Sequence, residues 1–179
     1  AVSSKAFCVI NDEIEDKMRA SVEKARLDGD SVGGVIECAV VGVPVGIGAN
    51  IFSTVEGHIS SALFGVPAVK GVEFGAGFDF AKMTGYEAND TYSISNGNVK
   101  INKNNNGGVL GGMTTGAPII VRAVVKPTPS ISKAQKSVNL QKMTDEELVI
   151  HGRHDPCIVP RAVPVVESAV AFALLDLMA

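Results

Sequence analysis

The densest group of chemically capable side chains lies at residues 152–157, where the sequence reads GRHDPC. The Arg153 guanidinium can bind a phosphate through two parallel hydrogen bonds. The Asp155 carboxylate can accept a proton if its environment tunes its pKa, and Pro156 favours an extended backbone at Asp155. The alternative is an Arg–Asp ion pair that only organises a loop. The residue types leave both interpretations open.

Two other loops combine unusual backbone residues with groups that bind anions. Residues 107–116 read GGVLGGMTTG, and glycines without Cβ atoms let a backbone lie against a planar ligand and point N–H groups at it. This pattern is neither a Walker motif nor a dinucleotide-binding fingerprint, and tight turns are the alternative. Residues 126–130 read KPTPS, in which two prolines stiffen a segment that carries one cation and two hydroxyls. This segment predicts a phosphate or polar-cofactor clamp, or else a rigid exposed connector.

Other kinds of site are disfavoured. A serine hydrolase would need a G-x-S-x-G elbow, which is absent, and Cys157 precedes two apolar residues, as a small buried residue would. The three histidines are scattered, so we expect no metal site. A hydride-transferring flavoprotein would need a nicotinamide fingerprint, which is also absent. Three cysteines, odd in number and far apart, favour a reducing, intracellular compartment.

Composition predicts one globular domain. The chain has 179 residues, of which 46% are apolar, with a formal net charge of −3. The Lys and Arg residues are scattered, which predicts neither a nucleic-acid groove nor a polybasic membrane anchor. Charges, glycines and prolines interrupt the long apolar runs, so no membrane span is expected.

Hydrophobic periodicity predicts the elements that must position these loops. An apolar stripe with spacings of four, four and three predicts a helix that begins after Asn11 and stops near Gly29, with an ion pair between Glu15 and Arg19. Ser53 and Glu56 have capping-box spacing ahead of a second helix. The predicted strands are residues 34–41, 69–74, 118–125 and, more weakly, 146–150, with the second helix at residues 54–64.

Two further features complete the predicted architecture. Residues 85–108 are polar and rich in Asn and Gly, and Asn96-Gly97 between two alternating runs predicts an exposed hairpin excursion. The last helix should start near Pro164, because the residue before a proline avoids the α conformation. This helix is apolar nearly all round, which predicts burial on most sides. Antiparallel pairing with helices predicts an α+β fold.

Six segments, taken in order, resemble the C-terminal half of chorismate synthase. The resemblance covers residues 28–178. Its segments are GDSVGG at 29–34, GVPVGIG at 42–48, PAVKGVE at 67–73, GGVLGG at 107–112, KPTPSI at 126–131, and GRHDPC at 152–157 followed by PRAVP at 160–164.

The resemblance implies an enzyme of the shikimate pathway, which leads to the aromatic amino acids. This lyase converts 5-enolpyruvylshikimate 3-phosphate (EPSP) to chorismate by a 1,4-elimination of phosphate and requires reduced FMN. It also implies a cytoplasmic homotetramer with a β-α-β sandwich fold, in which antiparallel sheets enclose helices. Residues 1–179 would then be either a single domain or the C-terminal half of a larger one.

Site residues follow from the same resemblance. Asp155 is implied to be catalytic, near the flavin ring, where it assists proton removal, and Arg153 would lie at both the flavin and the substrate. Pro67 stands where family members often carry Asn, so a backbone contact is expected there. The implied FMN contacts are Pro67, Ala68, Gly111, Lys126, Pro127, Thr128, Pro129, Ser130 and Arg153.

The family's N-terminal half has no counterpart in this sequence. That half carries two catalytic histidines, an Arg-Ser-Ser segment that binds FMN, and arginines that hold the substrate phosphates; neither His58 nor His154 stands in a matching context. We therefore expect this chain to be inactive unless the N-terminal half is supplied as a segment or a separate chain. The alternative is a non-catalytic FMN-binding or oligomerisation module.

Overall fold

A computed structural model describes residues 5, 7–49, 51–152 and 154–179. These residues form two compact units, which are described separately. The first comprises Ala1–Gly34 and Val125–Val163, and the second comprises Val35–Val124 and Pro164–Ala179. None of the helices in the described ranges has both the length and the apolar character needed to cross a bilayer.

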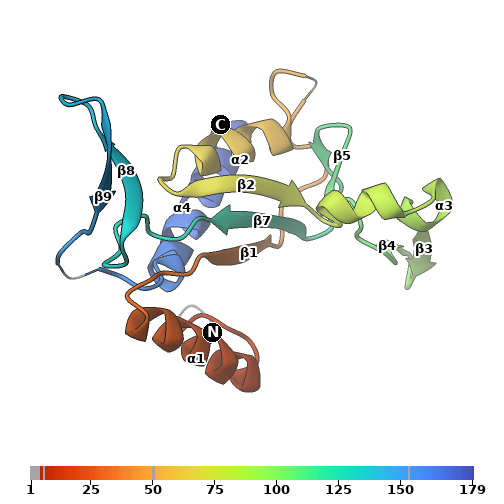
Figure 1. Ribbon diagram of the computed structural model, residues 1–179. Coiled ribbons are helices and arrows are strands. Elements are labelled where there is room, and N and C mark those ends of the chain that lie inside the picture. The colour runs from red at the N-terminus through yellow and green to blue at the C-terminus, as the bar shows by residue number, and fades with distance from the viewer. Residues whose placement is uncertain (1–4, 6, 50, 153) are drawn as a thin grey trace. The chain divides into compact units, whose positions relative to one another are not determined.

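A three-stranded sheet organises the second unit. Its order is β1 (Gly34–Val40), β7 (Ile119–Val125) and β2 (Val69–Phe74), so the last of these strands to be synthesised lies in the centre. The arrow of β7 runs opposite to those of both neighbours (Figure 1). Three strands predicted from the sequence are therefore confirmed, and their pairing is antiparallel.

The core of the second unit lies between this sheet and two helices, α2 (Val55–Phe64) and α4 (Val159–Met178). Alternate residues of the strands are buried, because successive side chains of a strand point to opposite faces. The buried side chains of the sheet and of the two helices are Ile36, Cys38, Val69, Ile119, Val121, Ala123, Val125, Val55, Ile59, Leu63, Val166, Val170, Ala173 and Leu174.

Helix α2 was predicted correctly, but its cap was not. The N-cap is Thr54, whose side-chain oxygen accepts a hydrogen bond from the Gly57 N–H at 3.0 Å. The predicted capping box of Ser53 and Glu56 is therefore wrong by one residue. Ser53 and Thr54 both carry a hydroxyl that can cap a helix, and the structure uses that of Thr54. Ser53 lies in the preceding turn, where its backbone carbonyl accepts a hydrogen bond from the Ala49 N–H.

Helix α4 begins earlier than predicted. It starts at Val159, and Pro164 lies inside it. Pro160 is tolerated in the first turn, where a backbone N–H has no helical partner in any case. Pro164 has no N–H to donate to the carbonyl of Pro160, four residues earlier. The missing hydrogen bond therefore lies in the first turn of the helix.

Helix α4 is also less buried than predicted. One side packs into the core, but large apolar residues on the other side are exposed, among them Phe172 and Leu175. The prediction of burial on most sides is wrong for this chain. Apolar residues on every side of a helix show which side chains could be buried. In this structure the described residues bury only one side of α4.

Short elements complete the second unit. The hairpin predicted at Asn96-Gly97 is confirmed: Ser95 pairs with Asn98, and both turn residues have positive φ, as a type I′ turn requires. These elements are η2 (Gly77–Lys82), α3 (Gly85–Ala88), β3 (Tyr92–Ser95), β4 (Asn98–Ile101), β5 (Val109–Leu110) and β6 (Met113–Thr114).

The first unit contains one long helix and one hairpin. Helix α1 (Asp12–Leu27) begins where predicted, because the Asn11 side chain accepts a hydrogen bond from the Glu13 N–H at 2.8 Å. The predicted pair of Arg19 and Glu15 is present at 2.6 Å. The hairpin consists of β8 (Gln135–Asn139) and β9 (Thr144–Leu148), and β9 overlaps the strand predicted at residues 146–150.

Candidate active site

The predicted site residues are divided between the two units. Residues 126–130 and Asp155 belong to the first unit, whereas Pro67, Ala68 and Gly111 belong to the second. Arg153 lies outside the described residues. The geometry of each group is therefore considered within its own unit.

In the first unit, residues 29–33 hold two predicted site segments next to each other, and we call them the bracing segment. The Ser31 hydroxyl donates a hydrogen bond to the carbonyl oxygen of Thr128 at 2.7 Å. The next residue, Val32, donates its backbone N–H to the carbonyl oxygen of Pro156 at 2.8 Å. Consecutive residues thus link the segment 126–130 to the segment that contains Asp155.

The end of the bracing segment requires a glycine. A Cβ atom at Gly33 would lie 2.3 Å from the Val125 carbonyl oxygen and 3.0 Å from the Pro127 ring. Backbone atoms of β7 cannot move away without disturbing the sheet. Gly33 therefore permits the close approach that lets Ser31 and Val32 reach their partners.

The other end of the bracing segment is fixed by backbone and charge. The Gly29 carbonyl accepts hydrogen bonds from the N–H groups of Ser132 and Lys133, at 3.1 and 3.2 Å. The Lys133 ammonium lies 3.0 Å from an Asp30 carboxylate oxygen. Its hydrogen bond lowers the pKa of Asp30, and the Ser31 backbone N–H lowers it further.

The segment 126–130 has the polar groups that a phosphate-bearing ligand needs. The Lys126 side chain is exposed at the end of β7. The Thr128 hydroxyl oxygen is buried and has no hydrogen-bond partner among the described residues. Buried polar groups are normally paired, so this hydroxyl fits a segment that is completed by another molecule or chain.

Asp155 forms an ion pair with a residue not anticipated from the sequence. Its carboxylate lies 2.5 Å from the Arg161 guanidinium, in the first turn of α4, and the pair is exposed to solvent. The neighbouring His154 lies with Nε2 3.2 Å from the Ile150 carbonyl oxygen. The ion pair orients the carboxylate, and an exposed partner can exchange for another charged group.

In the second unit, the glycine-rich segment folds against an earlier loop. Thr114 is almost fully buried, and its hydroxyl is fully paired. It donates a hydrogen bond to the Pro44 carbonyl at 2.6 Å and accepts one from the Ile47 N–H at 2.9 Å. The Gly112 carbonyl accepts a hydrogen bond from the Val55 N–H at 3.0 Å, at the start of α2. Turn formation thus explains most of this segment, whereas a Cβ at Gly111 would meet only open space.

Ala68 has a strained backbone at the other end of α2. Its φ is +73°, a conformation that residues with a Cβ rarely adopt, and it follows Pro67 in a turn closed by a hydrogen bond from Val69 to Val66. Helix α2 has ten residues and is about 15 Å long. Ala68 and Gly111 therefore lie near opposite ends of α2.

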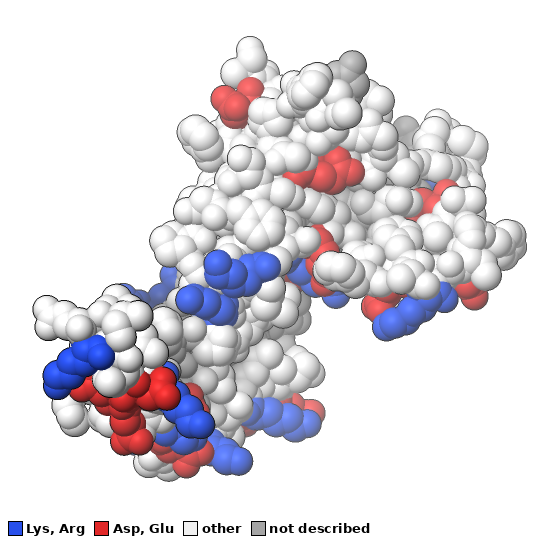
Figure 2. Space-filling model, turned by 45° about the horizontal axis from the view of Figure 1, so that its top comes forward, with Lys and Arg blue, Asp and Glu red and all other residues white. Residues whose placement is uncertain are grey.

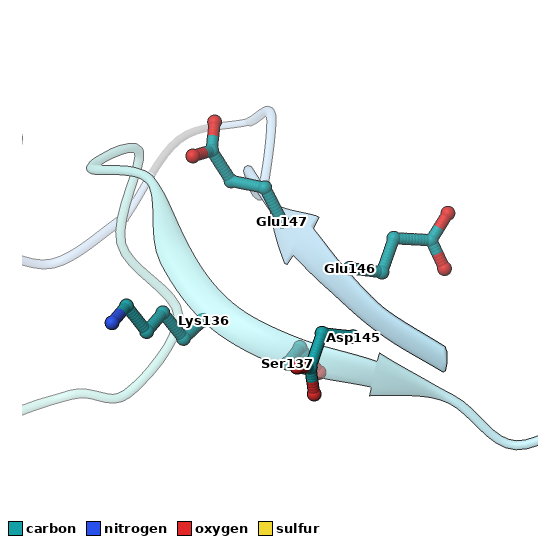
Figure 3. A pocket seen from close by; sticks show the side chains of 5 residues that line it. All are labelled: Lys136, Ser137, Asp145, Glu146 and Glu147. Atoms are coloured by element: carbon teal, nitrogen blue, oxygen red, sulfur yellow. The ribbon is translucent and has the colours of Figure 1, made fainter. Parts of the chain in front are cut away.

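A shallow hollow on the β8–β9 hairpin is not a convergent site. It is lined by Lys136, Ser137, Asp145, Glu146 and Glu147. The Glu146 and Glu147 side chains point to opposite sides of the hairpin, and Lys136 points away from both (Figure 3). The carboxylates consequently do not gather around one point, and across the residues that the structure describes no group of three His, Cys, Asp or Glu side chains could hold a metal ion.

Charge on the molecular surface is mixed. On the face shown in Figure 2, Lys and Arg side chains stand beside Asp and Glu side chains, and large areas carry no charge. The three cysteines are free, and burial raises the pKa of the Cys38 thiol.

These features define an α+β protein whose antiparallel sheets pack with helices. The family described as chorismate synthase matches residues 1–179, and the chain belongs to this family. The resemblance identified from the sequence is thus confirmed.

Several relatives support this assignment. The chain is 51% identical to the chorismate synthase of Korarchaeum cryptofilum over 93% of its own length and 46% of the relative. It is 51% identical to that of Thermococcus gammatolerans over 97% of its length and 49% of the relative. A crystal structure of chorismate synthase superposes with a TM-score of 0.72 and 30% identity, covering 92% of this chain and 42% of the other. The chain thus spans about half the length of these relatives, as a C-terminal type of segment.

The bracing segment is the part of the site that sequence reasoning missed. The motif at residues 29–34 contributed to the resemblance, but no chemistry was assigned to it. Its contacts join residues about 100 positions apart, such as Ser31 and Thr128. The available signal was a hydroxyl and two glycines between a helix and a strand, which is also typical of an ordinary turn.

Proposed function

We propose that this chain supplies the C-terminal part of a chorismate synthase active site. The reaction is the 1,4-elimination of phosphate from EPSP, in which a C–H bond and a C–O bond break and a new C=C bond forms without net redox change. The observation that carries the proposal is the bracing segment, which holds the KPTPS and HDP segments side by side in a chain of this family.

The cofactor we propose is reduced FMN, which when bound supplies an electron-rich ring beside the reacting carbons. Residues 126–130 would hold its polar end, with the Lys126 ammonium and the Thr128 and Ser130 hydroxyls as donors and the prolines fixing the backbone. The buried Thr128 hydroxyl, which has no hydrogen-bond partner among the residues that the structure describes, supports this fit. The proposed contacts also include Pro67, Ala68, Gly111 and Arg153. Ala68 and Gly111 lie at opposite ends of α2, so one cofactor would contact them with different parts of its own structure or from different copies of the chain.

Asp155 is the proposed proton acceptor. Its ion pair with Arg161 involves the ionised carboxylate, which is the form able to take up a proton. Arg153 is proposed to bind the flavin and the substrate. The remaining cations for the substrate phosphate, and the catalytic histidines, would come from the family's N-terminal half, as a further segment or a separate chain. A homotetrameric assembly in the cytoplasm is part of the same proposal.

The test is reconstitution. The chain is mixed with the N-terminal half of the Thermococcus gammatolerans relative, reduced FMN and EPSP, and chorismate and phosphate are measured. We expect both products in equal amounts from the mixture and none from this chain alone. Turnover by this chain alone would contradict the proposal, as would inactivity of a mixture in which the two parts associate.

A matched pair of variants assigns the proton acceptor. Asp155→Asn in the reconstituted pair should lower kcat by a factor of about 10² or more, in line with the loss of a general base. Asp145→Asn, on the exposed hairpin of the same unit, should leave kcat within about twofold. Equal activity of the two variants would remove Asp155 from the mechanism.

The second candidate function is a non-catalytic FMN-binding or oligomerisation module. It would need only the polar groups that residues 126–130 offer to a ligand, among them the buried Thr128 hydroxyl that has no partner among the described residues, and it would need no proton acceptor. FMN titration of the chain, followed by flavin fluorescence, distinguishes the candidates when it is combined with the reconstitution. Flavin binding with no turnover in an associated pair indicates the module, whereas turnover indicates the enzyme.

A further inference from the structure

The sequence contains two Asn-Gly dipeptides, and the structure gives them opposite surroundings. They are Asn96-Gly97, in the turn of the β3–β4 hairpin, and Asn106-Gly107, at the start of the glycine-rich segment. Asparagine is among the thermolabile residues of proteins. Its side chain deamidates most readily before a glycine, because glycine has no side chain to hinder attack by its own backbone nitrogen. The two dipeptides therefore provide a comparison within one chain.

The Asn96-Gly97 turn is open to this reaction. Both residues are exposed, and the hairpin projects with α3 beyond the end of the three-stranded sheet (Figure 1). Among the residues that the structure describes, neither the Asn96 side-chain amide nor the Gly97 N–H has a hydrogen-bond partner. All strand residues of the hairpin except Ile101 are exposed, and a two-stranded hairpin by itself is only marginally stable. Local opening that brings the Gly97 nitrogen to the Asn96 side-chain carbonyl therefore costs little.

The Asn106-Gly107 dipeptide, by contrast, is held by Asp90. One Asp90 carboxylate oxygen accepts hydrogen bonds from the Asn106 side-chain amide at 2.9 Å and from its backbone N–H at 3.1 Å. The other oxygen accepts the Asn105 N–H at 2.6 Å. The Gly107 N–H donates to the Asn104 carbonyl at 3.1 Å, and Gly107 is buried. The attacking nitrogen and the leaving amide are thus both engaged, so reaction here requires hydrogen bonds to break.

We propose that Asn96 is a site of spontaneous deamidation and that Asp90 protects Asn106 from the same reaction. The Gly97 backbone nitrogen forms a bond to Cγ of Asn96, the bond from Cγ to Nδ2 breaks, and the amide nitrogen leaves with the Gly97 proton as ammonia. Water, the only co-reactant, then opens the cyclic imide at either carbonyl, which leaves an aspartyl or an isoaspartyl residue at position 96. Neither step transfers electrons, and the inference does not depend on the proposed function.

The modification would alter the hairpin and spare the glycine-rich segment. An isoaspartyl residue adds one methylene to the main chain, so the two-residue turn no longer aligns Ser95 with Asn98. Either product adds a negative charge to a hairpin whose strands carry only one charged residue, Lys100. The Asp90 contacts lie between the hairpin and Gly107, and they hold the start of the segment 107–116 in place.

Peptide mapping tests the proposal, because trypsin separates the two dipeptides. Cleavage after lysine and arginine places Asn96 in the peptide 83–100 and Asn106 in the peptide 104–122. The folded 179-residue chain is incubated at mildly alkaline pH, and each peptide is followed by mass spectrometry for a gain of about 1 Da, the exchange of NH₂ for OH. We expect Asn96 to react about tenfold faster than Asn106 or more, because only Asn106 must first lose hydrogen bonds. In urea, where neither is held, the two rates should be similar.

Two variants test the protection separately. Asp90→Ala should raise the rate at Asn106 about tenfold or more and leave the rate at Asn96 within about twofold, because it removes hydrogen bonds of Asn106 alone among the two asparagines. Asp79→Ala, which removes an exposed carboxylate of the same unit, is the matched control and should change neither rate.

Two results would overturn the assignment of Asn96: equal rates for the two peptides in the folded chain, or a mass gain in peptide 83–100 that fragmentation places at Asn89 or Asn98. An unchanged rate at Asn106 in Asp90→Ala would overturn the protective role of Asp90. Neither flavin nor turnover is measured, so failure here is distinct from failure of the proposed reaction.

Discussion

The two units differ in what holds them together. The second unit has a continuous apolar core in which Ile59, Val121 and Val170 are essentially inaccessible to water. In the first unit, the predicted site segments are joined by single hydrogen bonds and one exposed ion pair, at Ser31, Val32 and Asp30. Burial supplies most of the free energy of folding, whereas a hydrogen bond adds a net contribution of about 1 kcal/mol. Stability and site geometry are thus carried by different parts of this chain.

The largest expected effect lies in the core of the second unit. Ile59→Ala removes a fully buried side chain between α2 and the sheet, and it should lower the free energy of unfolding by about 2–5 kcal/mol. Urea denaturation measures the change. Ile94→Ala, on the exposed strand β3, is the matched control and should shift the same quantity by no more than about 0.5 kcal/mol. Similar losses for the two variants would show that the core has been placed incorrectly.

The bracing segment should show a smaller effect on stability and a larger one on function. Ser31→Ala removes the hydrogen bond to Thr128 and should cost about 0.5–1.5 kcal/mol. In the reconstituted pair it should also weaken FMN binding, because residues 126–130 lose a fixed position. Ser21→Ala, on the exposed face of α1, should alter neither quantity. An unchanged flavin affinity for Ser31→Ala would separate the bracing segment from the site.

The smallest expected effect is the pH dependence of the Asp30–Lys133 pair. The pKa of Asp30 is lowered in the folded chain, so its contribution to stability is present above the ordinary value of 3.8 and is lost as the pH falls through the lower, folded value. Asp30→Asn should therefore narrow the difference in stability between neutral pH and about pH 3. Asp145→Asn, on the exposed β8–β9 hairpin of the same unit, serves as the control. A pH profile of Asp30→Asn identical to that of the wild type would show that the pair contributes nothing.

Local signals in the sequence were sufficient for most elements. The Asn96-Gly97 turn and the Asn11 cap depend on residues adjacent in the chain, so their chemistry could be read directly. The start of α4 was misjudged because the preference of the residue before Pro164 is a local tendency that packing overrides. The bracing contacts of Ser31 could not be predicted, because no local rule links it to Thr128. The partner of Asp155 was equally hidden, since both Arg153 and Arg161 lie near it in the sequence and no local rule chooses between them.

The exposed face of α4 shows a different limit. The sequence reports how apolar a helix is but not where its covering comes from. Phe172 and Val170 read alike as apolar residues, yet one is exposed and the other is fully buried. Only the packing of the second unit separates the two stripes.

Amide hydrogen exchange of the 179-residue chain tests the central claim most directly, because it reports local stability residue by residue. Val121 and Ala123 in the central strand β7 should exchange slowly, in step with global unfolding. The amides of Thr128 and Ser130 donate no hydrogen bond within the described part of the chain, and they should exchange at nearly the rate of an unstructured peptide. Equal protection of the two groups would contradict the account, since it would mean that the core and the predicted site are stabilised together.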